Sequence, residues 1–213
     1  MDVSVIIACH NYDKYLSRAI RSLVNQTMNR KSFEIIVVDD GSTDTTKKII
    51  ASYSGWLRPV ILSKNVGLAE ARNEGIRLAL GRFVVNVDAD DYVDENLLLV
   101  ESLYLKNNNH IHAVSCDYFV VNDEEAHVER VCGGEHPIAC GVMFRKDLLF
   151  DVGLYDPNFR VHEERDLRIR FCSKYKIENI PVPLYRYRKH GKNLTSDELV
   201  VGEYYKKLKE KHS

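Results

Sequence analysis

The chain has 213 residues, a length that suits one sizeable domain or two lobes that share a core. Its 45% hydrophobic and 29% charged residues are ordinary for a soluble globular protein. Lys+Arg (30) nearly balance Asp+Glu (31), so the formal net charge is −1. This balance gives no global reason to expect nucleic acid or an acidic polymer as a partner.

The cysteines and the N-terminal segment exclude further classes. The five cysteines are widely spaced and form no CxxC pair, which argues against zinc ribbons and thioredoxin-like chemistry and favours reduced thiols in a cytosolic protein. The segment "MDVSVIIACHN" has no basic region before its apolar run, and that run is too short for a signal peptide or a membrane span. We therefore expect a soluble protein that is at most peripheral to a membrane and has no transmembrane segment.

Short apolar runs alternate with helical patterns over the first part of the chain. Buried strands are predicted at 3–9, 33–40, 59–63 and 82–88. The helices between them are indicated by apolar residues at helical spacing and by cap residues: Leu16, Ala19, Ile20 and Leu23; Ser42, Thr43 and Asp44; Leu68, Ala71, Ile76 and Ala79 before a stop at Gly81; and a helix through Leu97 to Leu105. Strands that alternate with helices, each strand nearly all apolar, predict a parallel sheet covered on both faces.

Beyond about residue 111 the pattern changes. Two strands are predicted at 113–121 and 127–132, followed by "CGVMF", a short helix near 145–152, a helix from Glu163 to Tyr175, and "IENIPVPLYRYRKH". We predict one α/β sheet with a mixed, partly antiparallel second half. The tail "ELVVGEYYKKLKEKHS" is predicted to be a basic amphipathic helix, more typical of a solvated surface helix than of a membrane-surface one.

Polar residues close three of the predicted strands, at 8–11, 39–42 and 88–91. Ligands of open α/β sheets bind outside the carboxyl ends of the strands, so these segments should converge on one crevice. No GxGxxG follows the first strand and no GxxxxGK[ST] occurs anywhere, which argues against dinucleotide and P-loop sites.

The carboxylates of Asp88, Asp90 and Asp91, called here the acidic cluster, would repel one another and weaken the fold unless a bound cation relieved the repulsion. Such carboxylates favour a hard divalent cation, Mg²⁺ or Mn²⁺, whose remaining ligands are water and phosphate oxygens. Turns and helix caps also use aspartates, and Asp94 is well placed as a cap. Two acidic strand ends in one sheet, however, favour a metal ion that holds a diphosphate.

Five segments occur in an order and at a spacing that resemble one enzyme family: "VSVIIACHNYDKYLSRAIRSLVNQT", "FEIIVVDDGSTDTT", "NVGLAEARNEGIRLALGRFVVNVDADDY", "HEERDLRIR" and "YRYRKHGKNLT". From about residue 2 to 195 the chain resembles the family 2 glycosyltransferases of GT-A fold. The resemblance implies a single GT-A domain with a mixed central sheet. Its parts would be a Rossmann-like nucleotide-sugar-binding half (about 1–110), a smaller acceptor-binding and catalytic half (about 111–195) and a basic C-terminal helix (196–213).

The resemblance assigns roles to the acidic strand ends. Asp40 would bind the nucleotide base, a uracil imide, with Asp39 nearby or only capping the loop. Asp88 would approach the ribose, while Asp90, with Asp91 as a further candidate, would bind Mn²⁺ or Mg²⁺. The ion would neutralise the charge that grows on the leaving nucleoside diphosphate.

The same resemblance points to other residues of the nucleotide site. Arg72, in "EARNEG", would lie near the nucleotide, although an exposed ion pair with a glutamate of its own helix would also explain it. His190, in "YRYRKH", would lie near the diphosphate or metal; a structural histidine is the alternative. The family commonly has Pro and Tyr where this chain has Ala8 and His10, and an imidazole can still stack on a base.

Attack of a sugar hydroxyl on an anomeric carbon requires a general base. Glu164 is the candidate, because it opens a predicted helix and shares a stripe with Leu167, Phe171 and Cys172. It would then face the body of the protein, where desolvation would raise its pKa. Glu163 is the alternative base; the family often has Glu-Asp here, and a longer carboxylate can still accept a proton.

Two ion pairs on the same helix are the structural alternatives. Glu164 could pair with Arg168 at the i,i+4 spacing, which would stabilise the helix by only a few tenths of a kcal/mol. Asp166 is expected to pair with Arg170.

These residues together predict an inverting, metal-dependent transfer of one sugar from a nucleotide-sugar donor, a UDP-sugar, to a hydroxyl of a glycan or lipid-linked acceptor. The chain ends soon after the last motif, which favours single-sugar transfer over polymer synthesis. The alternatives are a metal-dependent nucleotidyltransferase or phosphotransferase, and a non-catalytic nucleotide-sugar-binding module. We expect a cytoplasmic location, at the inner face of the membrane, and no nucleic-acid partner.

Overall fold

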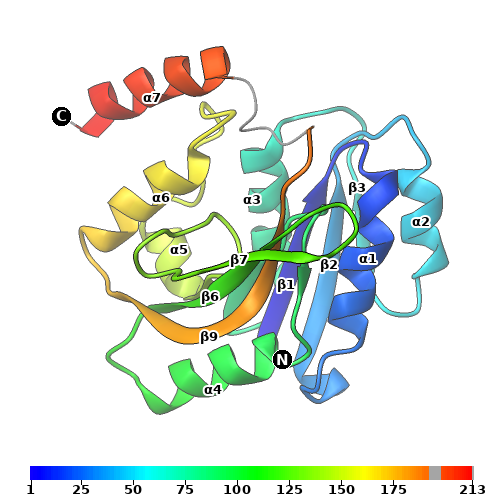
Figure 1. Cartoon of the computed structure of the whole chain (residues 1–213), viewed down its shortest axis with the longest axis horizontal. Coiled ribbons are helices and arrows are strands. Elements are labelled where there is room, and N and C mark those ends of the chain that lie inside the picture. The colour runs from blue at the N-terminus through cyan, green and yellow to red at the C-terminus, as the bar shows by residue number, and fades with distance from the viewer. Residues whose placement is uncertain (192–197, 213) are drawn as a thin grey trace.

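The computed structural model describes residues 1–191 and 198–212. Its strands form one sheet in the order β3-β2-β1-β4-β8-β6-β9-β5, with β7 paired to β6 (Figure 1). The strands are β1 (Val3–Cys9), β2 (Phe33–Asp39), β3 (Arg58–Ile61), β4 (Phe83–Asn86), β5 (Tyr92–Val93), β6 (Ala113–Val121), β7 (His127–Val131), β8 (Met143–Arg145) and β9 (Ile177–Arg188). The helices are α1 (Asp13–Val24), α2 (Thr46–Ser52), α3 (Leu68–Leu78), α4 (Leu97–Asn107), α5 (Lys146–Asp151), α6 (Glu163–Cys172) and α7 (Glu198–His212), with a 3₁₀ turn at Arg30–Ser32.

The sheet has a parallel first half and a mixed second half, as predicted. β1 pairs in parallel with β2 and β4, and β2 pairs in parallel with β3. β8 is antiparallel to both β4 and β6, whereas β9 is parallel to β6 and antiparallel to β5. In the parallel half the register sets Cys9 beside Asp39, so the strands end together and their following loops share one edge.

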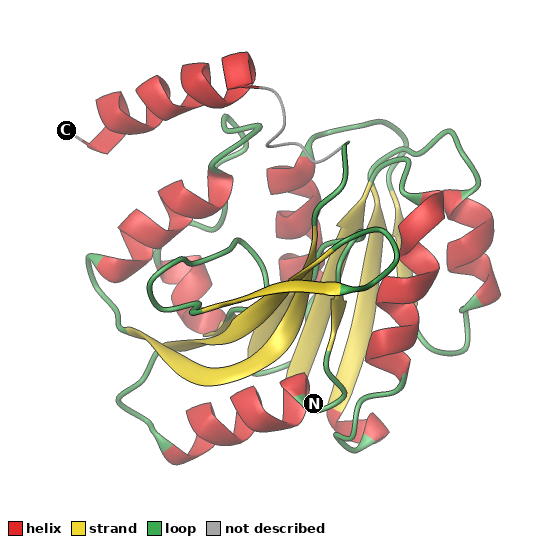
Figure 2. Ribbon diagram, viewed as in Figure 1, coloured by secondary structure: helices red, strands yellow, loops and turns green. Residues whose placement is uncertain are grey.

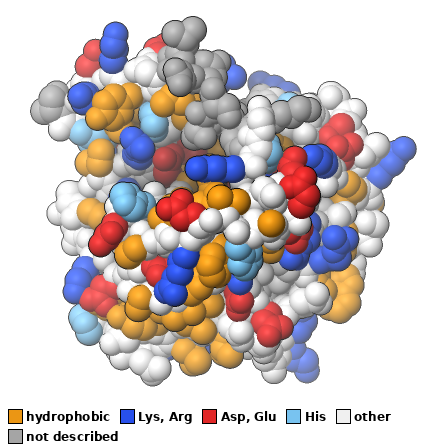
Figure 3. All heavy atoms as spheres, viewed as in Figure 1, with side chains coloured by type: hydrophobic (Ala, Val, Ile, Leu, Met, Phe, Trp, Pro, Cys, Tyr) orange, Lys and Arg blue, Asp and Glu red, His pale blue; other side chains and the backbone are white. Residues whose placement is uncertain are grey.

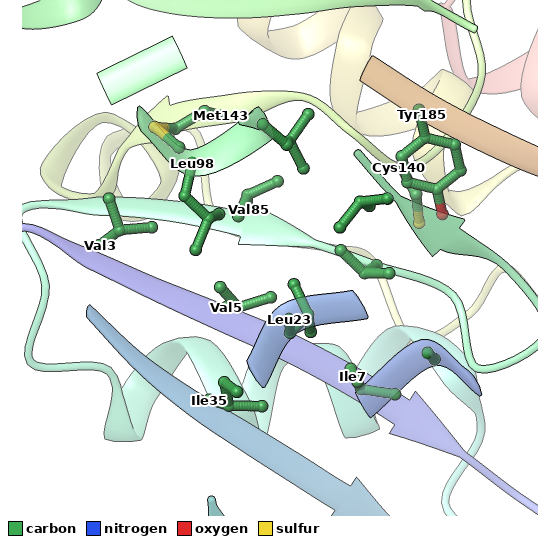
Figure 4. Close-up of a cluster of buried hydrophobic side chains, with 14 of the residues drawn as sticks. Val3, Val5, Ile7, Leu23, Ile35, Val85, Leu98, Cys140, Met143 and Tyr185 are labelled. Carbon is green, nitrogen blue, oxygen red and sulfur yellow. The ribbon is translucent and has the colours of Figure 1, made fainter. Parts of the chain in front are cut away.

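Alternate residues of the central strands fill two separate hydrophobic clusters, one on each face of the sheet. Val3, Val5 and Ile7 of β1 belong to the cluster that includes α1, α2 and α4 (Figure 4). Ile6 and Ala8 belong to the other cluster, which includes α3, α5 and α6. Figure 2 shows the resulting arrangement of helices around a twisted sheet. Both faces are covered, which explains why β1 and β2 are mostly apolar rather than alternating between apolar and polar residues.

The strand β3 differs from the prediction that every strand is buried on both faces. It forms one edge of the sheet, pairs only with β2, and has mostly exposed side chains. Pro59 suits such an edge, because it has no N–H to donate to a further strand. β7 is likewise exposed. The sequence pattern predicted a strand at this place but did not predict whether it would be buried.

Two further elements differ from the sequence-based prediction: the end of α3 and the strand β5. The helix α3 ends at Leu78 rather than at Gly81. Gly81 instead passes against β1, where a Cβ atom would lie 2.5 Å from the main-chain nitrogen of Ser4. The two-residue strand β5 was not predicted; Tyr92 and Val93 pair with β9 and bring the segment after the acidic cluster onto the sheet.

The C-terminal helix is less solvated than the sequence suggested. Of α7, Leu208 is buried, and Lys211 lies 2.7 Å from both Asp156 and Asp166. The predicted helix began at residue 196, and residues 196, 197 and 213 lie outside the described residues. On the face seen in Figure 3, acidic and basic side chains are interspersed rather than segregated.

Candidate functional site

The loops that follow β1, β2 and β4 meet at the carboxyl edge of the sheet, as predicted. His10 Nδ1 lies 2.7 Å from the main-chain oxygen of Asp40, and Asn11 Oδ1 accepts a 2.8 Å hydrogen bond from the main-chain nitrogen of Thr43. The loop after β4 lies close to the segment after β1 as well. Burial and then the charges of Asp90 and its neighbours raise the pKa of the Tyr12 phenol, and these charges act on it because they are near. The three segments therefore form one polar site.

The acidic cluster is compact. Asp88, Asp90 and Asp91 each offer a carboxylate oxygen, and these oxygens lie within 4.8 Å of one another. Burial, followed by the charge of Asp88, raises the pKa of Asp90, and His190 opposes this shift. Hard oxygen donors at this spacing, destabilised by mutual repulsion, fit a divalent cation.

His190 lies beside the acidic cluster. Its Nε2 is 2.9 Å from Asp90 Oδ2, and its ring stacks on Tyr15 with the ring centroids 4.8 Å apart. The side chain is almost fully buried. His190 is thus part of the acidic cluster's surroundings, and its contact with a metal or diphosphate stays a prediction.

Asp39 and Asp40 play different structural parts at the end of β2. Both oxygens of Asp40 accept main-chain hydrogen bonds, from Val66 at 2.7 Å and from Gly67 at 2.9 Å, so the carboxylate fixes the loop before α3. Asp39 is fully buried, and its Oδ1 accepts a 3.0 Å hydrogen bond from Ser42 N, as a loop cap would. Binding of a nucleotide base by Asp40 stays a prediction.

The two departures from the family pattern differ in exposure. Ala8 is buried in the core beneath α3, so its side chain offers little surface to a ligand. His10 is partly exposed at the rim of the site, where its ring could face a base. Contact of Ala8 and His10 with a nucleotide stays a prediction.

Arg72 is buried at the centre of the site, and the alternative of an exposed pair on its own helix is wrong. Its Nη2 lies 2.7 Å from Asp88 Oδ1, and its Nη1 lies 2.6 Å from Glu163 Oε1. The exposed pair on α3 belongs to Arg77, which contacts Glu70. Arg72 therefore connects the acidic cluster to the first turn of α6.

Of the two adjacent glutamates of α6, Glu163 and not Glu164 is the one turned into the body of the protein, which is the reverse of the prediction. The Glu163 side chain is 5% exposed and lies against Arg72, whereas the Glu164 side chain is 24% exposed. The proposed stripe also fails at Cys172, which is exposed. Burial, opposed by Arg72, raises the pKa of Glu163 to about 7. The desolvation expected for Glu164 thus falls on Glu163, because the helix starts at Glu163 and turns that residue inward.

The remaining pairs on α6 were partly predicted. Asp166 and Arg170 do form an ion pair, with Oδ2 and Nη2 2.6 Å apart. Arg168 instead donates from Nη2 to the main-chain oxygen of Ile138 at 3.0 Å, and the Glu164 carboxylate lies 4.0 Å from Arg165 Nε. The helix starts from His162, which adopts a left-handed conformation (φ 67°) that is uncommon for a residue with a side chain.

Tyr185 and Arg188 are site residues that the sequence alone did not single out. The Tyr185 hydroxyl lies 2.8 Å from Asp91 Oδ2, and Arg188 N lies 2.7 Å from Asp91 Oδ1. Both belong to the "YRYRKH" motif of β9, in which only His190 had been assigned. Alternation along the strand could have indicated that Tyr185 and Tyr187 share one face.

The α/β sheet, parallel in its first half and mixed in its second, has the GT-A fold, with the acidic cluster at its carboxyl edge. The structure is similar to that of residues 1–349 of Staphylococcus aureus TarS in complex with UDP-GlcNAc, with a TM-score of 0.82 and 24% identity over 92% of this chain and 61% of that chain. It is also similar to the mannosyltransferase PcManGT from Pyrobaculum calidifontis in complex with GDP-Man and Mn²⁺, with a TM-score of 0.76 and 19% identity over 95% of this chain and 61% of that one.

The chain belongs to glycosyl transferase family 2, whose model matches residues 4–152. An uncharacterized glycosyltransferase of Rickettsia conorii is 31% identical over 202 residues, which cover 89% of this chain and 33% of the relative. The poly(ribitol-phosphate) β-N-acetylglucosaminyltransferase TarS of S. aureus is 36% identical over 101 residues, or 46% of this chain and 18% of that protein. The chain thus spans a third or less of these relatives' lengths. The family resemblance and the GT-A fold are confirmed.

Proposed function

We propose that the chain is an inverting, metal-dependent glycosyltransferase that moves a single sugar from a UDP-sugar to a hydroxyl group of a glycan or lipid-linked acceptor. The observation that carries the proposal is the connected set Asp90, Asp88, Arg72 and Glu163, which leads from the acidic cluster to the start of α6. Glu164, the next residue, has a partly exposed side chain at that point.

The acidic cluster would hold the donor through Mn²⁺ or Mg²⁺. Asp90, with Asp91 or Asp88 beside it, would present the oxygen donors, and such ions use one or two carboxylates and complete their shell with water and phosphate oxygens. When bound, the ion supplies Lewis-acid stabilisation of the leaving diphosphate. PcManGT, a structural neighbour, was crystallised with GDP-Man and Mn²⁺, which supports this class of cofactor.

Glu164 is the proposed general base. The acceptor oxygen forms a bond to the anomeric carbon as the bond from that carbon to the diphosphate oxygen breaks, and the nucleoside diphosphate leaves with the electron pair. The acceptor hydroxyl proton passes to the Glu164 carboxylate. One displacement from the opposite face inverts the anomeric centre. Glu163 is less suited to this task, because it is buried against Arg72.

The identity of the donor and acceptor classes is supported by the relatives. TarS binds UDP-GlcNAc in its crystal structure and is named for transfer to poly(ribitol-phosphate), which favours a UDP-sugar and a cell-envelope acceptor here. No helix in the described part of the chain is both long and apolar enough to cross a membrane. A nucleotide-sugar and a lipid-linked acceptor would meet at the inner face of the membrane, so we place the reaction in the cytoplasm at that surface.

The proposal is tested by incubating the full chain with a panel of nucleotide-sugars and acceptors, with Mn²⁺, with Mg²⁺ and with EDTA. We expect release of UDP, together with a glycosylated product of inverted configuration, only when a divalent cation is present. Release of pyrophosphate would instead indicate nucleotidyl transfer. Donor binding without turnover over a broad acceptor panel would indicate a binding module.

A further inference from the structure

The three aspartates of the acidic cluster are not equivalent in their surroundings. Asp91 is 1% exposed, whereas the side chains of Asp88 and Asp90 are 28% and 11% exposed. Both oxygens of Asp91 already accept hydrogen bonds from β9, from Arg188 N and from the Tyr185 hydroxyl. The carboxylate of Asp91 is therefore buried and held by β9 at both of its oxygens.

The Tyr185 hydroxyl holds the acidic cluster at two points. It donates its proton to Asp91 Oδ2 at 2.8 Å and accepts a 3.1 Å hydrogen bond from the main-chain nitrogen of Asp88. A hydroxyl has one proton to donate, so this pattern uses it fully. Gly141 leaves room for the ring, because a Cβ atom at this position would lie 2.7 Å from the Tyr185 ring.

Arg188 fixes the segment between these points. Its main-chain nitrogen donates to Asp91 Oδ1, and its Nε donates to the main-chain oxygen of Asp90 at 2.8 Å. The Arg188 side chain also contacts Glu125 at 3.1 Å, so the guanidinium is itself held. The backbone on both sides of Asp90 is thus attached to β9.

We propose that Asp91 is a brace rather than a metal ligand, and that Tyr185 acts through it as a positioning residue that aims Asp88 and Asp90 at the divalent cation. This inference rests on the proposed metal-dependent function and deepens it, since it divides the acidic cluster between two tasks. A metal ion needs ligands held at fixed spacing, and residues that hydrogen-bond around a metal site typically change its affinity by about 10- to 100-fold. The ring of Tyr185 contributes to the core, but its hydroxyl has this separate role.

The test measures Mn²⁺ binding to the full chain in the presence of saturating UDP, from the electron paramagnetic resonance signal of free Mn²⁺, with UDP alone as the blank. Tyr185→Phe should weaken Mn²⁺ binding about 10- to 100-fold. Asp91→Asn should weaken it to a similar degree, and Asp90→Asn should abolish it. In the double variant Tyr185→Phe/Asp91→Asn the loss should not exceed that of Asp91→Asn alone, because coupled residues are not additive.

Tyr104→Phe is the matched control. The Tyr104 hydroxyl also donates to a carboxylate, Glu178, at 2.5 Å, but at the other end of β9. The variant Tyr104→Phe should bind Mn²⁺ with the same affinity as the wild type. Saturating Mn²⁺ should restore the turnover of Tyr185→Phe, which a general loss of structure would not allow.

The outcomes separate this inference from the proposed function. If the wild type binds Mn²⁺ and Tyr185→Phe binds it equally well, the inference is overturned but the proposed function is not. The same holds if the two single losses add, or if Asp91→Asn abolishes binding as Asp90→Asn does. Absence of Mn²⁺ binding by the wild type overturns the metal dependence and the inference with it.

Discussion

Arg72 of α3 and Glu163 of α6 form a buried ion pair in which Nη1 and Oε1 are 2.6 Å apart. The same guanidinium lies 2.7 Å from Asp88, so one side chain joins the donor-binding half to the helix that carries the candidate base. A planar guanidinium can serve two carboxylates at once, because its N–H groups point in fixed, divergent directions. Residues that are 91 positions apart in sequence are thereby held in one site.

Arg72→Lys should lower the free energy of unfolding by about 1 to 3 kcal/mol, since a single ammonium can pair with only one of Asp88 and Glu163 and leaves the other carboxylate without that partner. A lysine ammonium is a single compact charge and cannot span Asp88 and Glu163. Urea unfolding followed by circular dichroism measures the change.

Arg77→Lys is the control for this prediction, because Arg77 pairs with Glu70 on the exposed side of the same helix. It should change the free energy of unfolding by no more than about 0.5 kcal/mol. Equal losses for the two variants would contradict a bridging role for Arg72.

Glu164→Gln should reduce kcat by about 10²- to 10⁴-fold, the range expected for loss of a general base. Its affinity for UDP and Mn²⁺ should be unchanged, because the acidic cluster is untouched. Isothermal titration calorimetry and UDP release measure the two properties. Full turnover by Glu164→Gln would show that the base assignment is wrong.

Glu163→Gln separates the two glutamates. Because burial raises the pKa of Glu163 to about 7 even against Arg72, the folded chain keeps a proton there that the unfolded chain releases above about pH 4.5. The melting temperature of Glu163→Gln should therefore rise relative to that of the wild type as the pH increases from about 5 to 8. If Glu163→Gln lost turnover while Glu164→Gln remained active, Glu163 would be the base.

Much of the fold was predictable because β1, β2 and β4 are mostly apolar runs separated by helical patterns. The crevice was predictable for a related reason: parallel strands end at one edge, so Asp39, Asp40 and Asp88 had to lie near one another. The edge position of β3 was not, since strand order depends on long-range packing. A two-residue strand such as β5 carries too short a pattern to detect.

The errors at α6 have one cause. Helical periodicity assigns a face only when the starting residue and the direction of the core are known, and adjacent residues such as Glu163 and Glu164 differ by a rotation of about 100°. Arg72, which draws Glu163 inward, lies on α3 and leaves no signal near α6. The same argument applies to Tyr185, whose partner Asp91 is 94 positions away.

Lys211→Ala should release α7 from the body of the protein. Lys211 lies 2.7 Å from both Asp156 and Asp166, and although burial acts in the opposite direction, Lys211 lowers the pKa of Asp156 to about 2. Hydrogen–deuterium exchange should show faster exchange of α7 amides in the variant. Lys209→Ala is the control, because Lys209 lies over the exposed Tyr205 ring on the same helix. Equal exchange in both variants would show that this ion pair does not hold α7.

The depressed pKa of Asp156 also predicts a dependence on pH. The stabilisation contributed by the Asp156 carboxylate should be present above about pH 4 and should be lost as the pH falls towards 2.

Glu101 of α4 predicts a second pH dependence, with the opposite sign. Within the described part of the chain neither of its carboxyl oxygens has a hydrogen-bond partner, and burial raises its pKa well above the usual range, with the Cys116 thiol opposing the shift. The folded protein therefore keeps a proton that the unfolded chain releases above about pH 4.5. The free energy of unfolding should fall as the pH rises from that value towards the folded pKa, by about 1.4 kcal/mol for each unit of pKa difference.

Glu101→Gln should remove this dependence, because glutamine has no proton to release. Urea unfolding between roughly pH 5 and pH 8 should show the variant gaining stability over the wild type as the pH rises. Glu95→Gln is the control, since Glu95 is exposed and its carboxylate meets water in both states. A difference between Glu101→Gln and the wild type that stays constant with pH would mean that Glu101 titrates alike in the folded and unfolded chains, against its complete burial among the side chains of the core.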